Sequence, residues 1–425
     1  MGWNSWDCFG VDVTEDEVKA SAALMAERLR PVGWEYIVVD LAWYGDGLTA
    51  RGEQYKMEKP PQLIDKWGRL IPNASLHPSA ADGVGFKPLA DHLHGLGLKF
   101  GIHIMRGIPW QAVEAKSPIK GTPYTCDEIA LDEERCHWYK GMYSIDMTHP
   151  GGQAYYDSLG ELYASWDVDF VKADDMNSWT DEETSPYRVD EVEGISRALQ
   201  GSGRPMVLSL SPGGARLAQA AHLKRYAHMW RISPDFWDNW AALKKMFYRC
   251  ARWARFTGPQ SWPDADMLPM GRLALRAERG DPRETNFTED EQYTMMTLWC
   301  LARSPLMFGG HLPETGDFAW SLISNPEAMA VNQFSSGGRE VKKGRGTVFW
   351  AAQPEEGEGL YLGVFNTGDS GTKSVKVFPS QFGFDGEVQV RDLWERRNLG
   401  FSRKRFEVDV NQHGARLLLL RSVDL

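Results

Sequence analysis

Short apolar runs and helix-periodic segments alternate regularly over residues 1–334. The apolar runs end in polar or charged residues, which is typical of buried parallel strands that reach the carboxyl-terminal rim of a sheet. The segments between them repeat apolar positions at helical spacing, and Thr14-Glu15-Asp16-Glu17 has the spacing of a capping box. Eight such alternations without antiparallel hairpins predict an α/β fold, a closed (β/α)8 TIM barrel rather than an open doubly wound sheet.

The predicted barrel elements are short, and two long polar insertions, 44–85 and 106–149, follow the second and third strands. These insertions exceed ordinary connections and leave from the rim where the strands end, so we expect them to wall a pocket. Strands are predicted at residues 1–6, 36–40, 99–105, 170–174, 206–210, 228–232, 262–267 and 306–309. Helices are predicted at residues 14–30, 86–95, 150–166, 190–200, 215–225, 237–255 and 289–302.

The hydrophobic pattern changes after about residue 334. Short runs separated by Gly, Asp and Asn turns replace the strand–helix order, which is typical of an antiparallel sandwich. The sequence therefore predicts a catalytic barrel over residues 1–334 and a C-terminal β-sandwich domain over residues 335–425. The predicted sandwich strands are 347–352, 360–365, 374–377, 387–393, 405–410 and 415–420.

Composition excludes several classes of partner. The net charge of −11 argues against nucleic acid, which requires clustered Lys and Arg. No apolar run is long enough to span a membrane and no charged leader precedes an apolar core, so we expect a cytoplasmic, soluble protein, with residues upstream of Met1 left open.

Free Cys126 and Cys136 are favoured over a disulfide, which an oxidising compartment would allow. Composition leaves a homo-oligomer open.

Two strand ends carry the candidate chemistry. Lys172 and Asp174 close the run Phe170–Asp174, and Arg231 and Asp235 follow Trp230 roughly sixty residues later. Two rim carboxylates on different strands, each with a nearby cation, are the minimum equipment for cleaving a glycosidic bond. The chain also contains 18 tryptophans, whose indole faces suit the C–H faces of sugar rings.

A set of strand-end motifs resembles, in order, those of glycoside hydrolase family 27, which includes the α-galactosidases and α-N-acetylgalactosaminidases. The match runs over the whole barrel, and the Val390–Trp394 segment resembles the C-terminal sandwich of that family. The barrel motifs are Met1–Trp6, Val38–Asp40 with Trp43, Gly97–Ile102, Val168–Asp174, Trp230-Arg231 with Asp235, Gly258-Pro259 with Trp262 and Asp264–Leu268, and Ser304–Leu306.

The resemblance implies a retaining hydrolysis in which Asp174 is the nucleophile and Asp235 the general acid/base. A retaining pair of carboxyl groups lies about 5–5.5 Å apart. Lys172 points to the same face of the strand as Asp174 and is expected to keep that carboxylate ionised. No cofactor and no metal ion are expected. The predicted substrate-binding residues are Trp6, Asp40, Leu41, Trp43, His103, Lys172, Ser211, Gly214, Arg231, Asp266 and Met267.

The sequence departs from the family pattern at several of these positions. Leu41 stands where α-galactosidases carry a second aspartate, which with the first holds the 4- and 6-hydroxyls of galactose. Ser211 and Gly214 replace a glutamate and a leucine, as in the α-N-acetylgalactosaminidases, which make room for a 2-acetamido group; alternatively the insertions fill this space. His103 stands where the family shows an aromatic hydroxyl, and a purely structural histidine is the alternative. The cysteines that flank the nucleophile in animal members are absent.

These features predict a retaining exo-acting α-glycosidase that hydrolyses terminal α-galactosides of a glycoside or oligosaccharide. Within the family, α-N-acetylgalactosaminidase, β-L-arabinopyranosidase and isomaltose-releasing dextranase stay open. Outside it, the alternatives are a non-catalytic carbohydrate-binding protein and a metal-dependent barrel enzyme that uses Asp40, Asp174 and Asp266. The cations beside these carboxylates disfavour the metal, because they would compete with it.

Overall fold

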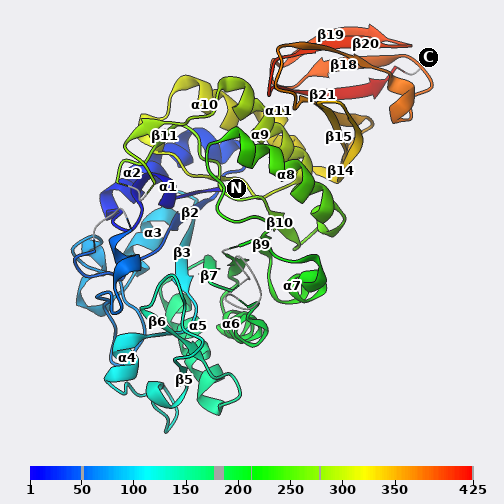
Figure 1. Cartoon of the computed structure of the whole chain (residues 1–425). Coiled ribbons are helices and arrows are strands. Elements are labelled where there is room, and N and C mark those ends of the chain that lie inside the picture. The colour runs from blue at the N-terminus through cyan, green and yellow to red at the C-terminus, as the bar shows by residue number, and fades with distance from the viewer. Residues whose placement is uncertain (49–51, 177–185, 212, 277–278, 424–425) are drawn as a thin grey trace.

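Eight parallel strands form a curled sheet around the centre of the larger part of the molecule (Figure 1). The structure is a computed structural model that describes residues 1–48, 52–176, 186–211, 213–276 and 279–423. Leu268, just after the edge strand Trp262–Asp264, pairs in parallel with Phe308 of the strand at the opposite edge and closes the barrel, so the predicted TIM barrel is confirmed. In spatial order the strands are β10 (Trp262–Asp264), β9 (Met229–Arg231), β8 (Val207–Leu210), β7 (Phe170–Asp174), β3 (Lys99–Met105), β2 (Tyr36–Val39), β1 (Gly2–Asn4) and β13 (Met307–Phe308).

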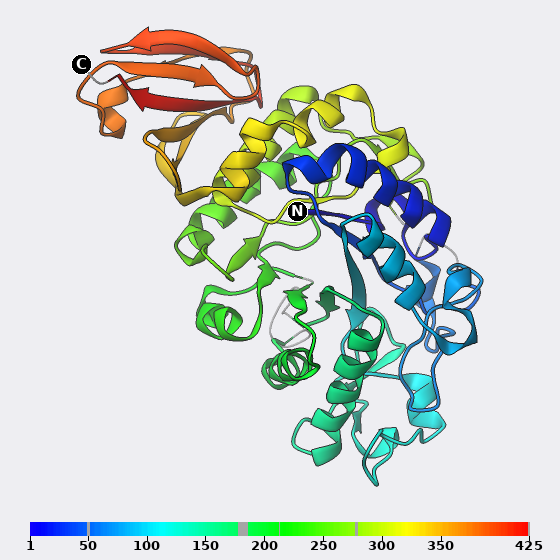
Figure 2. The same ribbon diagram turned by 180° about the vertical axis from the view of Figure 1, so that it is seen from behind.

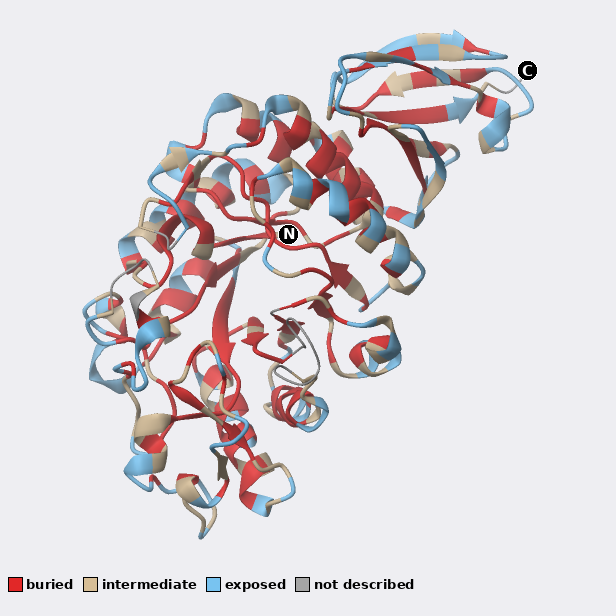
Figure 3. Ribbon diagram, in the orientation of Figure 1, coloured by how far each residue is buried: buried red, intermediate tan, exposed pale blue. Residues whose placement is uncertain are grey.

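Helices surround this sheet and bury their apolar faces against it, as Figures 2 and 3 show. The capping box predicted at Thr14 is present, because Thr14 accepts from the amide of Glu17 and Glu17 accepts from the amide of Thr14. The helix that follows ends earlier than expected, since a π turn and a 3-10 turn around Pro31 replace its last third. The outer helices are α2 (Glu15–Leu24), α3 (Lys87–Gly95), α5 (Pro150–Ser165), α6 (Val189–Gly201), α7 (Ala220–Tyr226), α8 (Trp240–Trp253), α9 (Glu289–Ala302), α10 (Asp317–Ile323) and α11 (Pro326–Gln333).

The two insertions differ in structure. Insertion 106–149 contains helix α4 (Trp110–Glu114) and a small antiparallel sheet in the order β4 (Ile108–Pro109), β6 (Met142–Ile145) and β5 (Ala130–Leu131). Insertion 44–85 consists of short 3-10 turns and isolated bridges in its described part. None of the described helices is long and apolar enough to cross a membrane.

The C-terminal part is an antiparallel sandwich, as predicted. A two-stranded sheet of β17 (Lys373–Val377) and β20 (Phe406–Val410) packs its valines against a six-stranded sheet. Strands β14 and β19 were not predicted, because most of their residues are solvent-accessible and show no apolar alternation. The six-stranded order is β14 (Ser335–Gly344), β15 (Thr347–Pro354), β16 (Leu360–Asn366), β21 (Ala415–Ser422), β18 (Val388–Asp392) and β19 (Arg397–Ser402).

The opposite face of the six-stranded sheet packs on the barrel at α8 and α9. Trp350 and Phe365 belong to the same buried cluster as the barrel core, and Phe365 meets Phe247 of α8 edge to face at 5.0 Å. Helix α11 ends at Gln333 and β14 begins at Ser335. The predicted division of the chain at 334/335 fits this change of element type and stays a prediction.

Gly338 of β14 offers a test of this packing. A Cβ at this position would lie 1.9 Å from the main-chain oxygen of Leu301 in α9, whereas a Cβ at Gly344 of the same strand would meet nothing within 4 Å. We expect Gly338→Ala to lower the free energy of unfolding by about 1–3 kcal/mol, since backbone must move to relieve the overlap. Thermal melting checks this, with Gly344→Ala as the matched control. Equal melting temperatures for the two variants would contradict the close approach.

Candidate active site

A cavity of about 340 Å³ opens at the carboxyl-terminal rim of the barrel strands. Asp174 ends β7, Asp40 directly follows β2, and Asp235 lies four residues after the end of β9. Both candidate catalytic carboxyl groups therefore face one pocket, although their separation of about 5–5.5 Å stays a prediction. The pocket is lined by Trp6, Asp7, Asp40, Leu41, Tyr55, His103, Trp138, Lys172, Asp174, Ser211, Arg231, Asp235, Phe236, Trp237, Asp266, Met267 and Arg279.

Hydrogen bonds fix both oxygens of Asp174. His103 Nε2 lies 2.8 Å from Oδ2, and the amide of Asp175 donates to Oδ1 at 2.5 Å. His103 and Lys172 are paired in register on the neighbouring strands β3 and β7, so the barrel geometry itself places the imidazole beside the carboxyl group. The carboxyl group is thus held in one orientation at the pocket wall.

Asp40 is held ionised by a different set of partners. Lys172 Nζ donates to its Oδ2 at 2.8 Å, Asn4 donates at 2.6 Å, and the amide of Leu41 donates to Oδ1 at 2.9 Å. Burial opposes ionisation, but the charge of Lys172 and these hydrogen bonds hold the pKa of Asp40 well below its usual value. We expected Lys172 to keep Asp174 ionised. Its direct ion pair is with Asp40, because Nζ reaches across to the second strand, while Asp174 interacts with its charge at longer range.

A second charged set supports Asp235. Its side chain is 40% exposed, and Arg231, which is 4% exposed, contacts it at 3.2 Å and Asp266 at 2.6 Å. Asp266 also accepts from the amides of Phe236 and Met267, at 2.7 and 2.8 Å. Asp266 therefore fixes both the guanidinium and the loop residue that follows Asp235.

Asp266 itself is strained and hard to ionise. Its φ of 86° is unusual for a residue other than glycine. Burial raises its pKa to about 6, and the charges of Asp235 and Asp264 act in the same direction against the charge of Arg231. The paired cation keeps this buried carboxylate available near neutral pH.

Comparison with known proteins relates this pocket to a family. The structure superposes on a β-L-arabinopyranosidase of glycoside hydrolase family 27 from Geobacillus stearothermophilus with a TM-score of 0.95 and 44% identity, over 100% of this chain and 96% of that chain. The chain belongs to glycoside hydrolase family 27.

Two family models also match the chain. The model described as alpha galactosidase A matches residues 138–334, and the one described as alpha galactosidase C-terminal beta sandwich domain matches residues 344–420. Alpha-galactosidase 2 of Arabidopsis thaliana is 28% identical over 99% of this chain and 88% of its own length. The alpha-galactosidase of Cyamopsis tetragonoloba is 27% identical over 99% and 85%. The protein is a glycoside hydrolase.

Two predicted substrate-binding residues of the family 27 enzyme lie outside the pocket. Trp43 is 1% exposed, sits edge to face against Phe86 and Trp166, and donates to the main-chain oxygen of His103 at 2.7 Å. It supports the strand that carries His103 and has no surface to offer a sugar. Gly214 lines a separate cavity of about 520 Å³ beside α8. The predicted room for a 2-acetamido group therefore rests on Ser211 alone; Pro212 lies outside the described residues.

Sequence reasoning missed several pocket residues. Tyr55 and Trp138 come from the two insertions, which were predicted to wall the pocket without a particular residue being identified. Asp7 directly follows Trp6, and its Oδ2 atom is buried without a hydrogen-bond partner among the described residues. Burial, followed by the charge of Asp266, raises the pKa of Asp7 well above its usual value. The remaining missed residues are Phe236, Trp237 and Arg279.

The ion pairs also bear on the metal alternative. Asp40 is bonded to Lys172 and Asp266 to Arg231, so two of the three proposed ligands already have a cation. A divalent ion would have to displace both ammonium and guanidinium groups from buried positions. The arrangement favours direct chemistry by the carboxyl groups.

The raised pKa of Asp266 predicts a pH-dependent stability. In the unfolded chain this carboxyl group titrates near its ordinary value of 3.8, and in the folded chain near 6. Its contribution is fully present below the unfolded pKa and is lost as the pH rises through about 6. Between pH 4.5 and 7 we expect the wild type to lose about 1–3 kcal/mol of unfolding free energy relative to Asp266→Asn, measured by urea unfolding. Parallel pH profiles for the two proteins would contradict this.

Proposed function

We propose that this family 27 enzyme removes terminal galacto-configured pyranosides by a retaining mechanism and prefers β-L-arabinopyranosides to α-D-galactopyranosides. The observation that carries the preference is the apolar side chain of Leu41, which lines the pocket beside the ionised Asp40. α-D-Galactosides are then slower substrates of the same site. This second activity is favoured by similarity to three plant α-galactosidases, which are 25–28% identical over most of the chain.

The two sugars differ only at one substituent. A β-L-arabinopyranoside has the ring configuration of an α-D-galactopyranoside but lacks the hydroxymethyl group. By the family resemblance, Asp40 accepts the axial 4-hydroxyl, while Leu41 replaces the carboxylate that would accept the 6-hydroxyl. A galactoside would bury that hydroxyl without a partner, at a cost of about 1–3 kcal/mol, whereas an arabinopyranoside has no such group. The 44% identity to a β-L-arabinopyranosidase supports the same preference.

The proposed reaction uses two carboxyl groups in two steps. Asp174 attacks the anomeric carbon while Asp235 gives its proton to the leaving oxygen, which breaks the glycosidic bond and forms a glycosyl ester. A water molecule then attacks the same carbon, Asp235 accepts its proton, and the ester bond to Asp174 breaks. The exposed position of Asp235 lets the leaving group and the water exchange at the mouth of the pocket.

The substrate is accordingly a glycoside or oligosaccharide that inserts its terminal sugar into the pocket. A cytoplasmic location stays a prediction; the five cysteines, all buried free thiols in the structure, fit a reducing compartment. A homo-oligomer also stays open.

Azide rescue tests the two catalytic assignments. With a p-nitrophenyl glycoside, Asp174→Asn should lose more than about a thousandfold in kcat, because no ester can form. Azide should restore turnover and yield a glycosyl azide of inverted configuration. In the matched variant Asp235→Ala, azide should instead trap the ester and yield the retained configuration. Product analysis by NMR checks both, and substantial activity of Asp174→Asn without azide would show that another group is the nucleophile.

Leu41→Asp tests the sugar preference. The new carboxylate would offer the missing acceptor, so the ratio of kcat/KM for the α-D-galactoside to that for the β-L-arabinopyranoside should rise by about ten- to a hundredfold. Leu41→Ala, which only opens space, is the control and should leave the ratio close to that of the wild type. An equal rise in both variants would mean that space rather than the polar contact sets the preference.

A further inference from the structure

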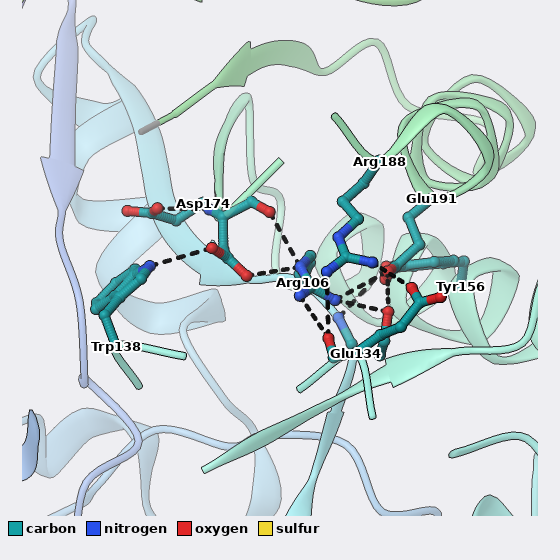
Figure 4. A network of polar contacts seen from close by, with 10 residues as sticks. Arg106, Glu134, Trp138, Tyr156, Asp174, Arg188 and Glu191 are labelled. Carbon is teal, nitrogen blue, oxygen red and sulfur yellow. Dashed lines mark hydrogen bonds and ion pairs between the residues drawn. The ribbon is translucent and has the colours of Figure 1, made fainter. Parts of the chain in front are cut away.

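A buried arginine joins the residue after Asp174 to insertion 106–149 (Figure 4). Arg106 is 1% exposed, and its guanidinium reaches four other segments of the chain. Nε donates to Oδ2 and to the main-chain oxygen of Asp175, at 2.7 and 3.0 Å. The two terminal nitrogens donate to Ser144 Oγ at 2.7 Å, Glu191 Oε1 at 3.0 Å and the main-chain oxygen of Glu134 at 2.9 Å.

The surroundings of Arg106 leave each buried charge with partners. Glu191 also accepts from Ser144 at 2.6 Å and from Tyr156 at 2.7 Å. Asp175 is 5% exposed and uses its other oxygen, Oδ1, to accept from the indole nitrogen of Trp138 at 3.1 Å. Removing one partner would leave a buried charge uncompensated, which strongly destabilises a folded protein. The side chains of this network are therefore held in the arrangement that satisfies every charge.

Asp175 thereby connects the candidate nucleophile to an aromatic wall of the pocket, which is formed by Trp138 and Tyr55. Its amide donates to Asp174 Oδ1, and its φ of 61° turns its side chain away toward Arg106. The indole of Trp138, which Asp175 holds by a hydrogen bond, lines the pocket. It meets Tyr55 of the other insertion edge to face, with the ring centroids 5.7 Å apart. The wall is therefore positioned by a carboxylate that is not itself part of the pocket lining.

The residues that line the pocket from the barrel strands differ in chemistry from Trp138 and Tyr55. Asp40, Lys172 and Arg231 lie at or next to strand ends and suit a sugar rich in hydroxyl groups. Trp138 and Tyr55 are instead partly exposed aromatic side chains on insertions that rise from the rim. An aromatic face in that place suits the C–H face of a second sugar or an aromatic leaving group.

We infer that Trp138 forms the wall for the leaving group and that Asp175, anchored by Arg106, is its positioning residue. The inference rests on the proposed glycosidase function and adds the side of the site that receives the aglycone. It makes Asp175 a determinant of leaving-group affinity without a role in the bond-breaking steps.

The experiment compares substrates with and without an aglycone. Trp138→Phe keeps an aromatic ring but cannot donate to Asp175, and Asp175→Ala leaves Arg106 paired with Glu191. For a p-nitrophenyl β-L-arabinopyranoside, each variant should lower kcat/KM by about tenfold, because a hydrogen bond to a charged acceptor is lost, and the double variant should lose no more than either single one. For β-L-arabinopyranosyl fluoride, whose leaving group is too small to reach the wall, all three should stay near the wild type.

Trp110→Phe is the matched control. Trp110 lies in the same insertion and donates its indole hydrogen to Pro60, outside the pocket, so this variant should change neither substrate. Additive losses in the double variant, or equal losses with the fluoride, would overturn the inference. If Asp175→Ala does not fold by circular dichroism, the aryl-to-fluoride ratio of Trp138→Phe alone still decides the role of the wall. A wrong sugar assignment shows separately, as poor wild-type turnover of both arabinosides, and the same ratios are then measured with the α-D-galactosyl pair.

Discussion

The structure depends on three ion pairs, each of which joins a carboxylate buried at the barrel rim to a cation of its own. Asp40 is joined to Lys172, Asp266 to Arg231, and Asp175 to Arg106. Removing such groups from water costs several kcal/mol each, which only close ion pairs with further hydrogen bonds offset. The paired cations therefore offset the repulsion between the carboxylates that lie close together at the rim.

The pairing leaves the two candidate catalytic groups with weaker partners. Within the described residues, Asp174 has a histidine and a main-chain amide but no lysine or arginine within 4 Å. Asp235 shares Arg231 with Asp266 at the longer of two distances, and it faces solvent. A nucleophile locked in an ion pair would have to break it in order to attack. The cations thus fix the surrounding carboxylates, and the two candidate catalytic carboxyl groups stay accessible.

Much of this arrangement was predictable from the sequence, because a buried parallel strand is visible as a short apolar run followed by charged residues. That pattern located Asp40, Asp174 and Arg231 at the ends of their strands and Asp235 shortly after one of them; the family resemblance added Asp266 and the catalytic roles of Asp174 and Asp235. Strand position does not say which of several facing groups a long side chain will reach. The ion pair of Lys172 with Asp40 rather than Asp174 is such a case.

Other features had no signal in the sequence. Trp43 and Gly214 stand close in sequence to pocket residues, but the turns after β2 and β8 direct them into the core and into another cavity. The wall residues Tyr55 and Trp138 lie in insertions whose polar pattern specifies no element. Strand β19 is mostly exposed and gave no apolar alternation. In each case tertiary contacts, which one sequence does not display, decide the outcome.

The network around Arg106 fixes the chain beside the candidate nucleophile Asp174 without the cysteines that flank this position in animal members of the family. A disulfide would fix the backbone beside Asp174 through a single bond to one neighbouring segment. Arg106 instead bonds Asp175 on one side and Glu134, Ser144 and Glu191 on the others, so insertion 106–149 and helix α6 share one anchor with the loop after β7. Because the same carboxylate also holds Trp138, the position of the insertion is coupled to the loop after β7. Substitutions in this insertion are therefore constrained by this network as well as by the shape of the leaving group.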